Sequence, residues 1–423
     1  MSFETISVVG LGYIGLPTAA MFASRKKKVV GVDVNQHAVD TINKGQIHIV
    51  EPKLDMIVHA AVNEGFLKAV TTPEPADAFL IAVPTPFKGE HEPDLSYIEA
   101  ACKAIAPVLK KGDLVILEST SPVGATEQMA EWLAEARNDL TFPQQVGESA
   151  DVNIAHCPER VLPGHVVREL VENDRVIGGG MTKKCSTRSV ELYKTFVEGE
   201  CVVTNARTAE MAKLTENSFR DVNIAFANEL SVICSELDIN VWELIALSNR
   251  HPRVNILQPG PGGVGGHCIA VDPWFIVSKT PELARLIHTA RLVNDQKPDW
   301  VIDKVKAQIA DRLLAQPNKS ADQLTVACYG LTFKPDIDDL RESPSLSIAR
   351  RVAQLNLGTV LLVEPNIETL PSGFTANSEL VSTEIALQHA DIHVLLVPHK
   401  EFVEVSVKFN EQANVVDTVG LTK

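Results

Sequence analysis

The segment TISVVGLGYIG, residues 5–15, decides the fold of the first half of the chain. Its first five residues predict a short apolar strand, and a turn with three glycines follows at once. An alanine-rich helical pattern then runs to about Ser24, and a second strand is predicted over residues 28–32. That strand ends at Asp33, 18 residues after Gly15. A strand, a glycine turn, a helix and a second strand that ends in an acid form the context of a dinucleotide-binding turn.

Each glycine of this turn has its own physical use. Gly10 makes the tight turn, Gly12 admits a pyrophosphate to the N-terminus of the helix, and Gly15 lets helix and strand pack closely. The Asp33 carboxylate accepts a hydrogen bond from a ribose hydroxyl and repels a 2′-phosphate. The turn therefore predicts NAD, rather than NADP, as the cofactor.

The alternation of strands and helices continues through both ends of the chain and predicts doubly wound parallel sheets. We expect an α/β fold with two doubly wound Rossmann-like domains joined by a long central helix, residues 206–238. Further strands are predicted at 79–83, 114–117 and 153–157, and, after a polar linker at 316–322, at 325–329, 359–363, 393–397 and 414–416. The expected domains are an NAD-binding domain (1–204), a central helical domain with a long loop (205–315) and a C-terminal domain (316–423).

Composition disfavours several classes of protein. The 423 residues carry 39 basic and 54 acidic side chains, a net charge of −15 that disfavours nucleic acid or an anionic membrane as partner. The seven cysteines are scattered without C-x-x-C spacing, so we expect neither a metal site nor a disulfide framework. Neither a basic-then-apolar leader nor an apolar run of ~20 residues is found. We expect a soluble, cytoplasmic protein.

Polar residues follow three of the predicted strands, at the sheet edge where open α/β sheets bind ligands. Thr85, Thr120 and Glu159 are the candidates in these three positions. For the two threonines, helix capping is an alternative that can coexist with ligand contact. Glu159 directly follows a buried strand, which favours a role in the site.

One polar stripe runs along the predicted central helix. Glu210, Lys213, Asn217 and Arg220 share it, at i, i+3, i+7 and i+10, while much of the remaining surface is apolar. A polar stripe is usually a solvated face. Because a long apolar helix between two domains should leave little of its face exposed, we instead expect the stripe to line a cleft that suits an anionic substrate.

Residues 249–272 form a loop rich in proline and glycine, and Cys268 lies near its end in GGHCIAVDP, residues 265–273. A loop of this length is functional or disordered, and its apolar content argues against disorder. A thiol beside glycines can attack an electrophilic carbon on a closely bound ligand. The alternative for Cys268 is a small buried hydrophobic residue.

A second charged turn follows the first strand of the C-terminal domain, in FKP (333–335) and DDLRESP (338–344). Lys334 and Arg341 are candidate ligand contacts there. Surface ion pairs with Asp336, Asp338 or Asp339 are an equal alternative from the sequence.

Together these motifs resemble the UDP-glucose/GDP-mannose dehydrogenase family, across essentially the whole chain. The segments that carry the resemblance are 10–15 with Asp33, VPTP (83–86), 118–124, CPER (157–160), 210–217, 265–273 and 333–344.

The resemblance implies a four-electron oxidation of a sugar primary alcohol to a carboxylate, with two NAD and one water. It implies Cys268 as the nucleophile that traps the aldehyde, Lys213 as proton donor and acceptor, and Asp272 and Glu159 as groups that position or deprotonate water. It assigns the nucleotide-sugar contacts to Arg160, Val161, Lys213, Asn217, Arg220, His251, Arg253, Gly265, Phe333 and Lys334. It assigns the NAD contacts to Gly10, Gly12, Tyr13, Ile14, Gly15, Asp33, Thr85, Thr120, Thr126 and Arg341.

Two segments, 216–223 and 249–255, resemble the family members that oxidise UDP-N-acetyl-D-mannosamine for surface polysaccharide synthesis. The resemblance also implies a UDP-binding C-terminal domain and a homodimer formed through the central helix. UDP-GlcNAc, UDP-glucose and GDP-mannose stay open as substrates. A two-electron β-hydroxyacid dehydrogenase and a non-enzymatic NAD-sensing protein stay open as other classes.

Three departures from the family pattern affect the predicted site. The loop GPGGVGG, residues 260–266, is one glycine longer than the family's, and Gly178 opens a glycine run that is also one longer. Val419 stands where relatives place a basic residue. We expect the loop around Gly263 to absorb its additional residue as a local bulge.

Overall fold

The structure is a computed structural model that describes residues 3–49, 51–89, 91–161, 164–178, 182–265 and 269–422. The chain divides into two compact units, residues 1–216 with 274–279, and residues 217–273 with 280–423. Cys268, the predicted nucleophile, lies outside the described residues, as do Gly179 and Gly180 of the second glycine run.

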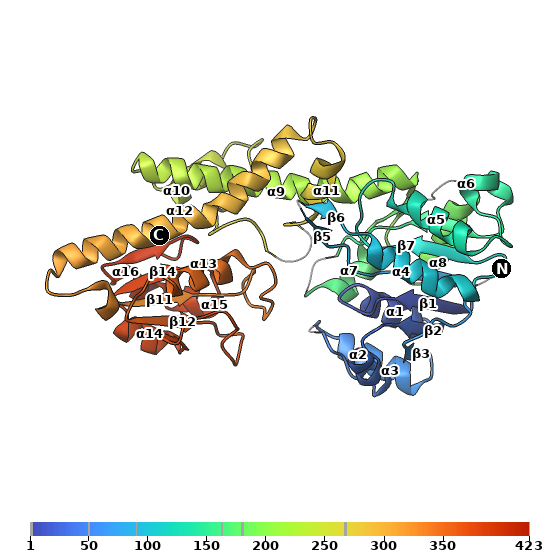
Figure 1. The fold of residues 1–423 in the computed structure, drawn as a ribbon, viewed down its shortest axis with the longest axis horizontal. Coiled ribbons are helices and arrows are strands. Elements are labelled where there is room, and N and C mark those ends of the chain that lie inside the picture. Colours follow the sequence, from blue (N-terminus) through green and yellow to red (C-terminus); the bar gives the residue numbers. More distant parts are fainter. Residues whose placement is uncertain are drawn as a thin grey trace. The chain divides into compact units, whose positions relative to one another are not determined.

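The first unit is built on an eight-stranded sheet with the order β10-β9-β8-β7-β4-β1-β2-β3. Figure 1 labels β7, β1, β2 and β3 of this sheet. From β3 to β8 every neighbouring pair is parallel, and this is the strand order of a dinucleotide-binding sheet. β9 joins β8 in the antiparallel sense, and β10 pairs with β9 in parallel. The strands are β1 Thr5–Val9, β2 Lys28–Val32, β3 Leu67–Val70, β4 Ala78–Ile81, β7 Leu114–Leu117, β8 Asn153–His156, β9 Arg175–Gly178 and β10 Cys201–Thr204, with a separate hairpin of β5 Phe87–Lys88 and β6 Glu92–Pro93.

Helices cover both faces of this sheet. Phe22 of α1 and Tyr193 of α8 belong to the core on one face, and Ile98 of α4 and Met129 of α5 to the core on the other. The helices are α1 Gly15–Ser24, α2 Gln36–Asn43, α3 Leu54–Asn63, α4 Ser96–Ile105, α5 Ala125–Ala136, α6 Pro143–Val146, α7 Val166–Glu172, α8 Lys183–Tyr193 and α11 Asp272–Lys279, with 3₁₀ turns at Ala106–Val108 and Gly147–Ser149.

The second unit contains a five-stranded sheet, all parallel, in the order β13-β12-β11-β14-β15. Val301 of α12 and Ile348 of α13 pack on one face, and Phe402 of α15 and Phe409 of α16 on the other. The strands are β11 Thr325–Tyr329, β12 Thr359–Val363, β13 Ser378–Leu380, β14 Ile392–Leu395 and β15 Val415–Asp417, and the helices are α10 Val241–Ser248, α12 Arg285–Ala315, α13 Pro344–Ala353, α14 Thr383–His389, α15 Lys400–Glu404 and α16 Ser406–Asn410, with a 3₁₀ turn at Ala321–Gln323. The largely parallel first sheet, the parallel second sheet and the central helix confirm the predicted fold class.

The central helix α9 spans Ala206–Glu236, and its residues are shared between the two units. The expectation that little of its face is exposed is wrong for the single chain. Phe219 and Phe226 of α9 are 69% and 51% exposed, and Ile233 is 45% exposed. The apolar stripe that these residues form is left uncovered by the chain's own core, which explains why apolar content alone misjudged its burial.

The strands at 5–9, 28–32, 114–117, 325–329 and 359–363 were predicted with the observed ends, whereas the one predicted at 79–83 runs from Ala78 to Ile81. The strands β3, β9, β10 and β13, the β5–β6 hairpin and the helix α11 were not predicted. Within the described ranges, no helix combines the length and apolar character needed to cross a membrane.

Candidate active site

The glycine turn after β1 has the geometry that its sequence predicts. Gly10 has a φ of +90°, and a Cβ placed there would lie 2.5 Å from the carbonyl oxygen of Ala82. A Cβ at Gly15 would lie 1.8 Å from the carbonyl oxygen of Gly10. Both positions therefore require glycine for the fold itself.

Gly12 differs from the other two glycines. A Cβ built at Gly12 meets no atom within 4 Å, and the residue is exposed. Packing within the chain therefore does not demand glycine at this position. An open, side-chain-free backbone at the N-terminus of α1 is the surface that a pyrophosphate needs, so the turn fits a dinucleotide.

Asp33 is tied to the same turn. Its Oδ2 accepts a hydrogen bond of 2.8 Å from the Leu11 amide, and its Oδ1 accepts one of 2.9 Å from the Asn35 amide. The carboxylate is held half-buried at the end of β2, with further lone pairs available to a ribose hydroxyl. The predicted ribose contact therefore has the position and the chemistry for its role.

The other predicted NAD contacts occupy different environments. Tyr13 and Ile14 are half-buried beside the glycine turn. The Thr85 hydroxyl donates to the Thr120 carbonyl at 2.5 Å, joining the ends of β4 and β7. Helix capping was the alternative role for these two threonines. This bond is not a helix cap, because it joins two loop residues.

Thr126 is buried, and its hydroxyl donates to Glu210 Oε1 at 2.7 Å. The same carboxylate accepts from the amides of Gly124 and Thr126, so it closes the N-terminus of α5. The Glu210 carboxylate, predicted as part of the polar stripe of α9, is thus bonded to the N-terminus of α5. Arg341 lies in the second unit, where it forms an ion pair with Asp339 at 2.5 Å, as the surface-pair alternative expected.

Glu159 belongs to a buried charge cluster that the sequence did not reveal. Its Oε2 is 2.8 Å from Arg175 Nη2, and Arg175 is also 3.7 Å from Glu118 Oε1. Tyr193 donates to Glu118 at 2.6 Å. Burial raises the pKa of Glu118 to about 7, helped by the negative charge of Glu159 and opposed by Arg175. One guanidinium thus serves two carboxylates, and burial keeps the pKa of Glu118 above its ordinary value.

One feature of the sequence could have indicated that Arg175 belongs to a buried ion pair. It is the only charged residue of the otherwise apolar stretch RVIG, residues 175–178, and an arginine that opens a buried strand needs an acidic partner. Because β9 was not predicted, the pairing with Glu159 could not be predicted either.

Two predicted catalytic-site residues of the second unit are in direct contact. Asn217 Nδ2 donates to Asp272 Oδ2 at 2.5 Å, and both side chains are buried. This bond joins α9 to the first residue of α11, directly after the loop that holds Cys268. Lys213, four residues before Asn217 on α9, is half-buried.

The Pro/Gly loop that precedes Cys268 is fixed at three points. Asn228 of α9 accepts from the Gly260 amide at 2.9 Å and donates to the Gly262 carbonyl at 2.8 Å. Asn228 also donates to Asn294 of α12 at 2.9 Å. A Cβ at Gly265 would lie 2.4 Å from the Glu342 carbonyl oxygen and 2.6 Å from Phe333 Cβ, so the loop passes against the turn after β11. Asn228 is a second residue that sequence reasoning missed.

The predicted nucleotide-sugar contacts are found in both units. Arg160 forms an ion pair with Glu216 at 2.7 Å, and Val161 is half-buried. Arg220, His251 and Arg253 are exposed, whereas Phe333 and Lys334 are half-buried in the turn after β11. Val419, where a basic residue was expected, packs beside the core of the C-terminal sheet, and its amide donates to Asp417.

Three family descriptions match successive parts of the chain. The NAD binding domain of the UDP-glucose/GDP-mannose dehydrogenase family matches residues 4–197, the central domain of that family matches 207–296, and its UDP binding domain matches 327–423. Together these matches extend over most of the sequence.

Individual relatives match over the full length. The chain is 70% identical to the UDP-N-acetyl-D-mannosamine dehydrogenase of Yersinia pestis over 421 residues, 100% of both chains. It is 64% identical to the NDP-N-acetyl-D-galactosaminuronic acid dehydrogenase of Ralstonia nicotianae, over 100% of this chain and 97% of that one. The solved structure of the UDP-D-ManNAc dehydrogenase of Pyrococcus horikoshii is 37% identical, with a TM-score of 0.86 over 99% of this chain and 96% of that chain.

Proposed function

This chain belongs to the UDP-glucose/GDP-mannose dehydrogenase family, and from that premise we propose that it oxidises UDP-N-acetyl-D-mannosamine to UDP-N-acetyl-D-mannosaminuronate. The observation that carries the choice of sugar is the 70% identity, over the whole of both chains, to a UDP-N-acetyl-D-mannosamine dehydrogenase. The product is a uronate building block for surface polysaccharide. NAD is the cofactor of the enzyme.

NAD, when bound, supplies the acceptor for a hydride from carbon 6 in each of two oxidations. The open backbone at Gly12 receives its pyrophosphate, and Asp33 receives a ribose hydroxyl. Tyr13, Ile14, Thr85, Thr120, Thr126 and Arg341 complete the proposed contacts.

The residues of this chain divide the remaining chemistry between them. Lys213 takes the proton of the sugar hydroxyl in the first oxidation and, with Asn217, stabilises the oxyanion that develops. The Cys268 thiolate attacks the resulting aldehyde and gives a thiohemiacetal. Loss of the second hydride from that adduct leaves a thioester, which water hydrolyses to the carboxylate and the free thiol.

Asp272 and Glu159 are the proposed groups for that water. The bond from Asn217 holds Asp272 beside the loop of Cys268, which suits direct action on water. Both oxygens of Glu159 are engaged, one by Arg175 and one by the amide of Arg160. These contacts favour a role for Glu159 in orienting Arg160.

The nucleotide half of the substrate goes to the C-terminal domain, with Phe333 and Lys334 as contacts. Arg160, Val161, Arg220, His251, Arg253 and Gly265 complete the proposed sugar site. We keep the division into domains at 1–204, 205–315 and 316–423 as part of the proposal. We also place the enzyme in the cytoplasm, as a homodimer formed through α9.

One alternative has an observation in its favour. The 64% identity to an NDP-N-acetyl-D-galactosaminuronic acid dehydrogenase keeps a different sugar epimer open. A two-electron hydroxyacid dehydrogenase or an NAD sensor would have no use for a UDP-binding domain, which the third family match includes.

The test measures NADH released per sugar with UDP-ManNAc, UDP-GlcNAc, UDP-GalNAc, UDP-glucose and GDP-mannose. We expect two NADH per UDP-ManNAc and the highest kcat/KM for that sugar. One NADH per sugar would identify a two-electron enzyme, and none with any sugar would favour a sensor.

The same assay on Cys268→Ser tests the covalent step. The variant should still bind NAD and the sugar, but give at most a small burst of NADH with negligible carboxylate, because a hydroxyl is a much weaker nucleophile near neutral pH. Two NADH per sugar at the parental rate would show that Cys268 is an ordinary thiol.

A further inference from the structure

The second unit repeats the backbone of the NAD-binding turn with different chemistry. After β11, Gly330 has a φ of +91° and its amide donates to the Val363 carbonyl at 2.8 Å, as Gly10 with a φ of +90° donates to Val32 at 2.8 Å. The next amide, Leu331, donates to Glu364 at 2.7 Å, as Leu11 donates to Asp33 at 2.8 Å. Glu364 therefore occupies the position, after the second strand, of a ribose-binding acid.

Glu364 is nevertheless closed to a ribose. Its side chain is fully buried, and His399 lies against it with 3.0 Å between Nε2 and Oε2. Oε2 also accepts from the amides of Leu331 and Thr332, and Oε1 accepts from the amide and the side chain of Asn366. Thr332, also buried, stands where the first turn has the open Gly12. This turn is not a second dinucleotide site.

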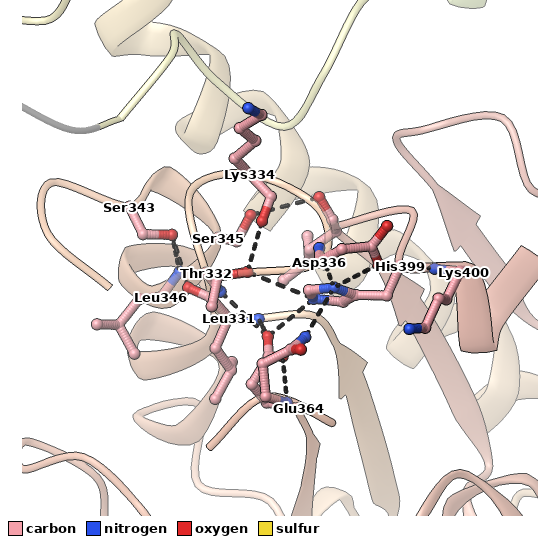
Figure 2. Close-up of polar contacts among 12 residues, drawn as sticks. Leu331, Thr332, Lys334, Asp336, Ser343, Ser345, Leu346, Glu364, His399 and Lys400 are labelled. Atoms are coloured by element: carbon pink, nitrogen blue, oxygen red, sulfur yellow. Dashed lines mark hydrogen bonds and ion pairs between the residues drawn. The ribbon is translucent and has the colours of Figure 1, made fainter. Parts of the chain in front are cut away.

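The Asp336 amide indicates which ring nitrogen of His399 accepts a hydrogen bond. Nδ1 accepts from the Asp336 amide at 3.0 Å, so Nε2 carries the proton and donates to Glu364. Burial alone would raise the pKa of Glu364, but the hydrogen bonds from His399 and from the Leu331 amide hold that pKa below its ordinary value. The His399 imidazole thus bridges the Glu364 carboxylate and a backbone amide (Figure 2).

These contacts hold both ends of one segment, residues 331–336. Glu364 binds the amides at its start, and His399 binds the amide of Asp336 at its end. Between them the Thr332 hydroxyl donates to the Lys334 carbonyl at 2.9 Å (Figure 2). Phe333 and Lys334 are carried by this segment, and Phe333 Cβ borders Gly265 of the loop that leads to Cys268.

We propose that Glu364 and His399 are positioning residues of the nucleotide-sugar site, which fix the 331–336 segment and thereby the UDP contacts of Phe333 and Lys334. Glu364 has the position that Asp33, the proposed ribose contact, has in the first unit, but it holds a loop. This inference rests on the proposed function, because that function assigns Phe333 and Lys334 to the UDP-sugar.

The test titrates the full-length protein with UDP and, separately, with NAD by calorimetry. Both carboxylate oxygens of Glu364 accept hydrogen bonds, one from Asn366 and the other from His399. In Glu364→Gln one of these oxygens is replaced by an amide NH₂, which would face an N–H donor instead of accepting from it. We expect Glu364→Gln and His399→Ala to weaken UDP binding about tenfold or more, with NAD binding within about twofold of the parent. His399→Gln keeps the donor to Glu364 and His399→Asn keeps the acceptor for Asp336, so each should lie between His399→Ala and the parent.

The control is His393→Gln. His393 is another buried histidine of the same sheet, and its hydrogen bond of 2.9 Å goes to Tyr329 rather than to a residue of the 331–336 segment. This variant should lower the melting temperature and leave UDP affinity within about twofold. If His399 only stabilised the fold, His399→Ala would likewise lower the melting temperature and leave UDP affinity unchanged.

A milder variant decides the matter if the buried pair proves essential for folding. Thr332→Val removes the hydroxyl that donates to the Lys334 carbonyl and that also lies 3.4 Å from His399 Nε2, and Thr332→Ser restores it. We expect the first to weaken UDP binding about threefold or more and the second to recover it. Folded variants of Glu364, His399 and Thr332 that all bind UDP like the parent would overturn the inference. A parent protein that binds NAD but not UDP would overturn the proposed function as well.

Discussion

At the scale of single residues, one carboxylate, that of Asp33, has an observed contact and a proposed one. It accepts a hydrogen bond from the Leu11 amide of the glycine turn, and we propose that its remaining lone pairs accept one from the ribose of NAD. We expect Asp33→Ala to lower kcat/KM for NAD by roughly 10- to 150-fold, the range for a hydrogen bond to a charged group. The kcat/KM for NADP should fall less, because the repulsion of the 2′-phosphate is also removed.

The measurement compares kcat/KM for the two cofactors in parent and variant. The parent should strongly prefer NAD. Equal efficiency with NAD and NADP in the unmutated protein would contradict the assignment of Asp33 to the ribose.

Lys213 has a position on α9 that suits its proposed role as acid and base. It lies four residues before Asn217, which is bonded to Asp272 beside the loop of Cys268. Lys213→Ala should lower kcat by roughly two to four orders of magnitude, the usual contribution of a general acid or base. Steady-state turnover with saturating NAD and sugar is the measurement, and near-normal turnover would mean that the lysine only binds phosphate or faces water.

Glu118 makes the first unit sensitive to pH. Because its folded pKa is raised to about 7 from an ordinary 4.5, its contribution to the free energy of unfolding is full below about pH 4.5 and is lost as pH rises through about 7. Glu118→Gln is neutral at every pH and should reduce that loss, by at most about 3 kcal/mol. Melting temperatures between pH 5 and pH 8.5 measure the effect.

The matched control is Glu127→Gln, whose carboxylate lies on the surface in an ion pair with Arg207 at 2.7 Å. It should leave the slope of melting temperature against pH close to that of the parent. If Glu118→Gln and the parent show the same slope, Glu118 does not take up a proton in this range.

At the scale of elements, α9 and α12 hold the loop that carries the proposed nucleophile. Asn228→Ala would leave the Gly260 amide and the Gly262 carbonyl without their partner, at a cost of about 1–3 kcal/mol in stability. Since the loop leads to Cys268, we also expect kcat to fall while NAD affinity is unchanged. Asn223→Ala, which removes only a bond to Phe219 within α9, is the control. Equal kcat in both variants would show that the Asn228 contacts do not position the loop.

The same loop carries the additional glycine, and its absorption as a bulge around Gly263 stays a prediction. Asn228 fixes the chain at Gly260 and Gly262, and Gly265 is wedged against Glu342 and Phe333. Gly263 and Val264, where the sequence predicted a bulge, lie between these fixed points, and a Cβ at Gly263 would lie 3.0 Å from Asn294 Cβ. That the segment from Gly265 to Asp272 keeps the family's geometry stays a prediction, because Cys268 lies outside the described residues.

The elements that the sequence predicted well have local signals. β1 and the turn after it could be predicted because the role of each glycine, and of Asp33 after β2, depends only on the strand–turn–helix–strand unit to which it belongs. β9 could not, because its four residues begin with an arginine whose partners, Glu118 and Glu159, come after two other strands, β7 and β8. Asn228 and Glu364 were missed for the same reason: their partners are distant in sequence, and a lone polar residue in an apolar pattern does not show which backbone groups it will meet.

At the scale of the whole molecule, the uncovered face of α9 is the strongest argument for a dimer. Phe219, Phe226 and Ile233 are spaced by seven residues, which places them on one face of a helix. All three are at least 45% exposed in the single chain. Contiguous exposed apolar side chains of this size mark an interface, and a second α9 would bury them by symmetry.

We therefore expect sedimentation velocity to give twice the chain mass of 46.0 kDa for the parent protein. Phe226→Glu should shift the protein toward the monomer, because the dimer would bury two unpaired carboxylates, one from each copy. Val407→Glu, on an exposed apolar residue of α16 outside the stripe, should leave the mass unchanged. A monomeric parent, or a Phe226→Glu variant that stays dimeric at low micromolar concentration, would mean that the apolar face of α9 is covered in some other way.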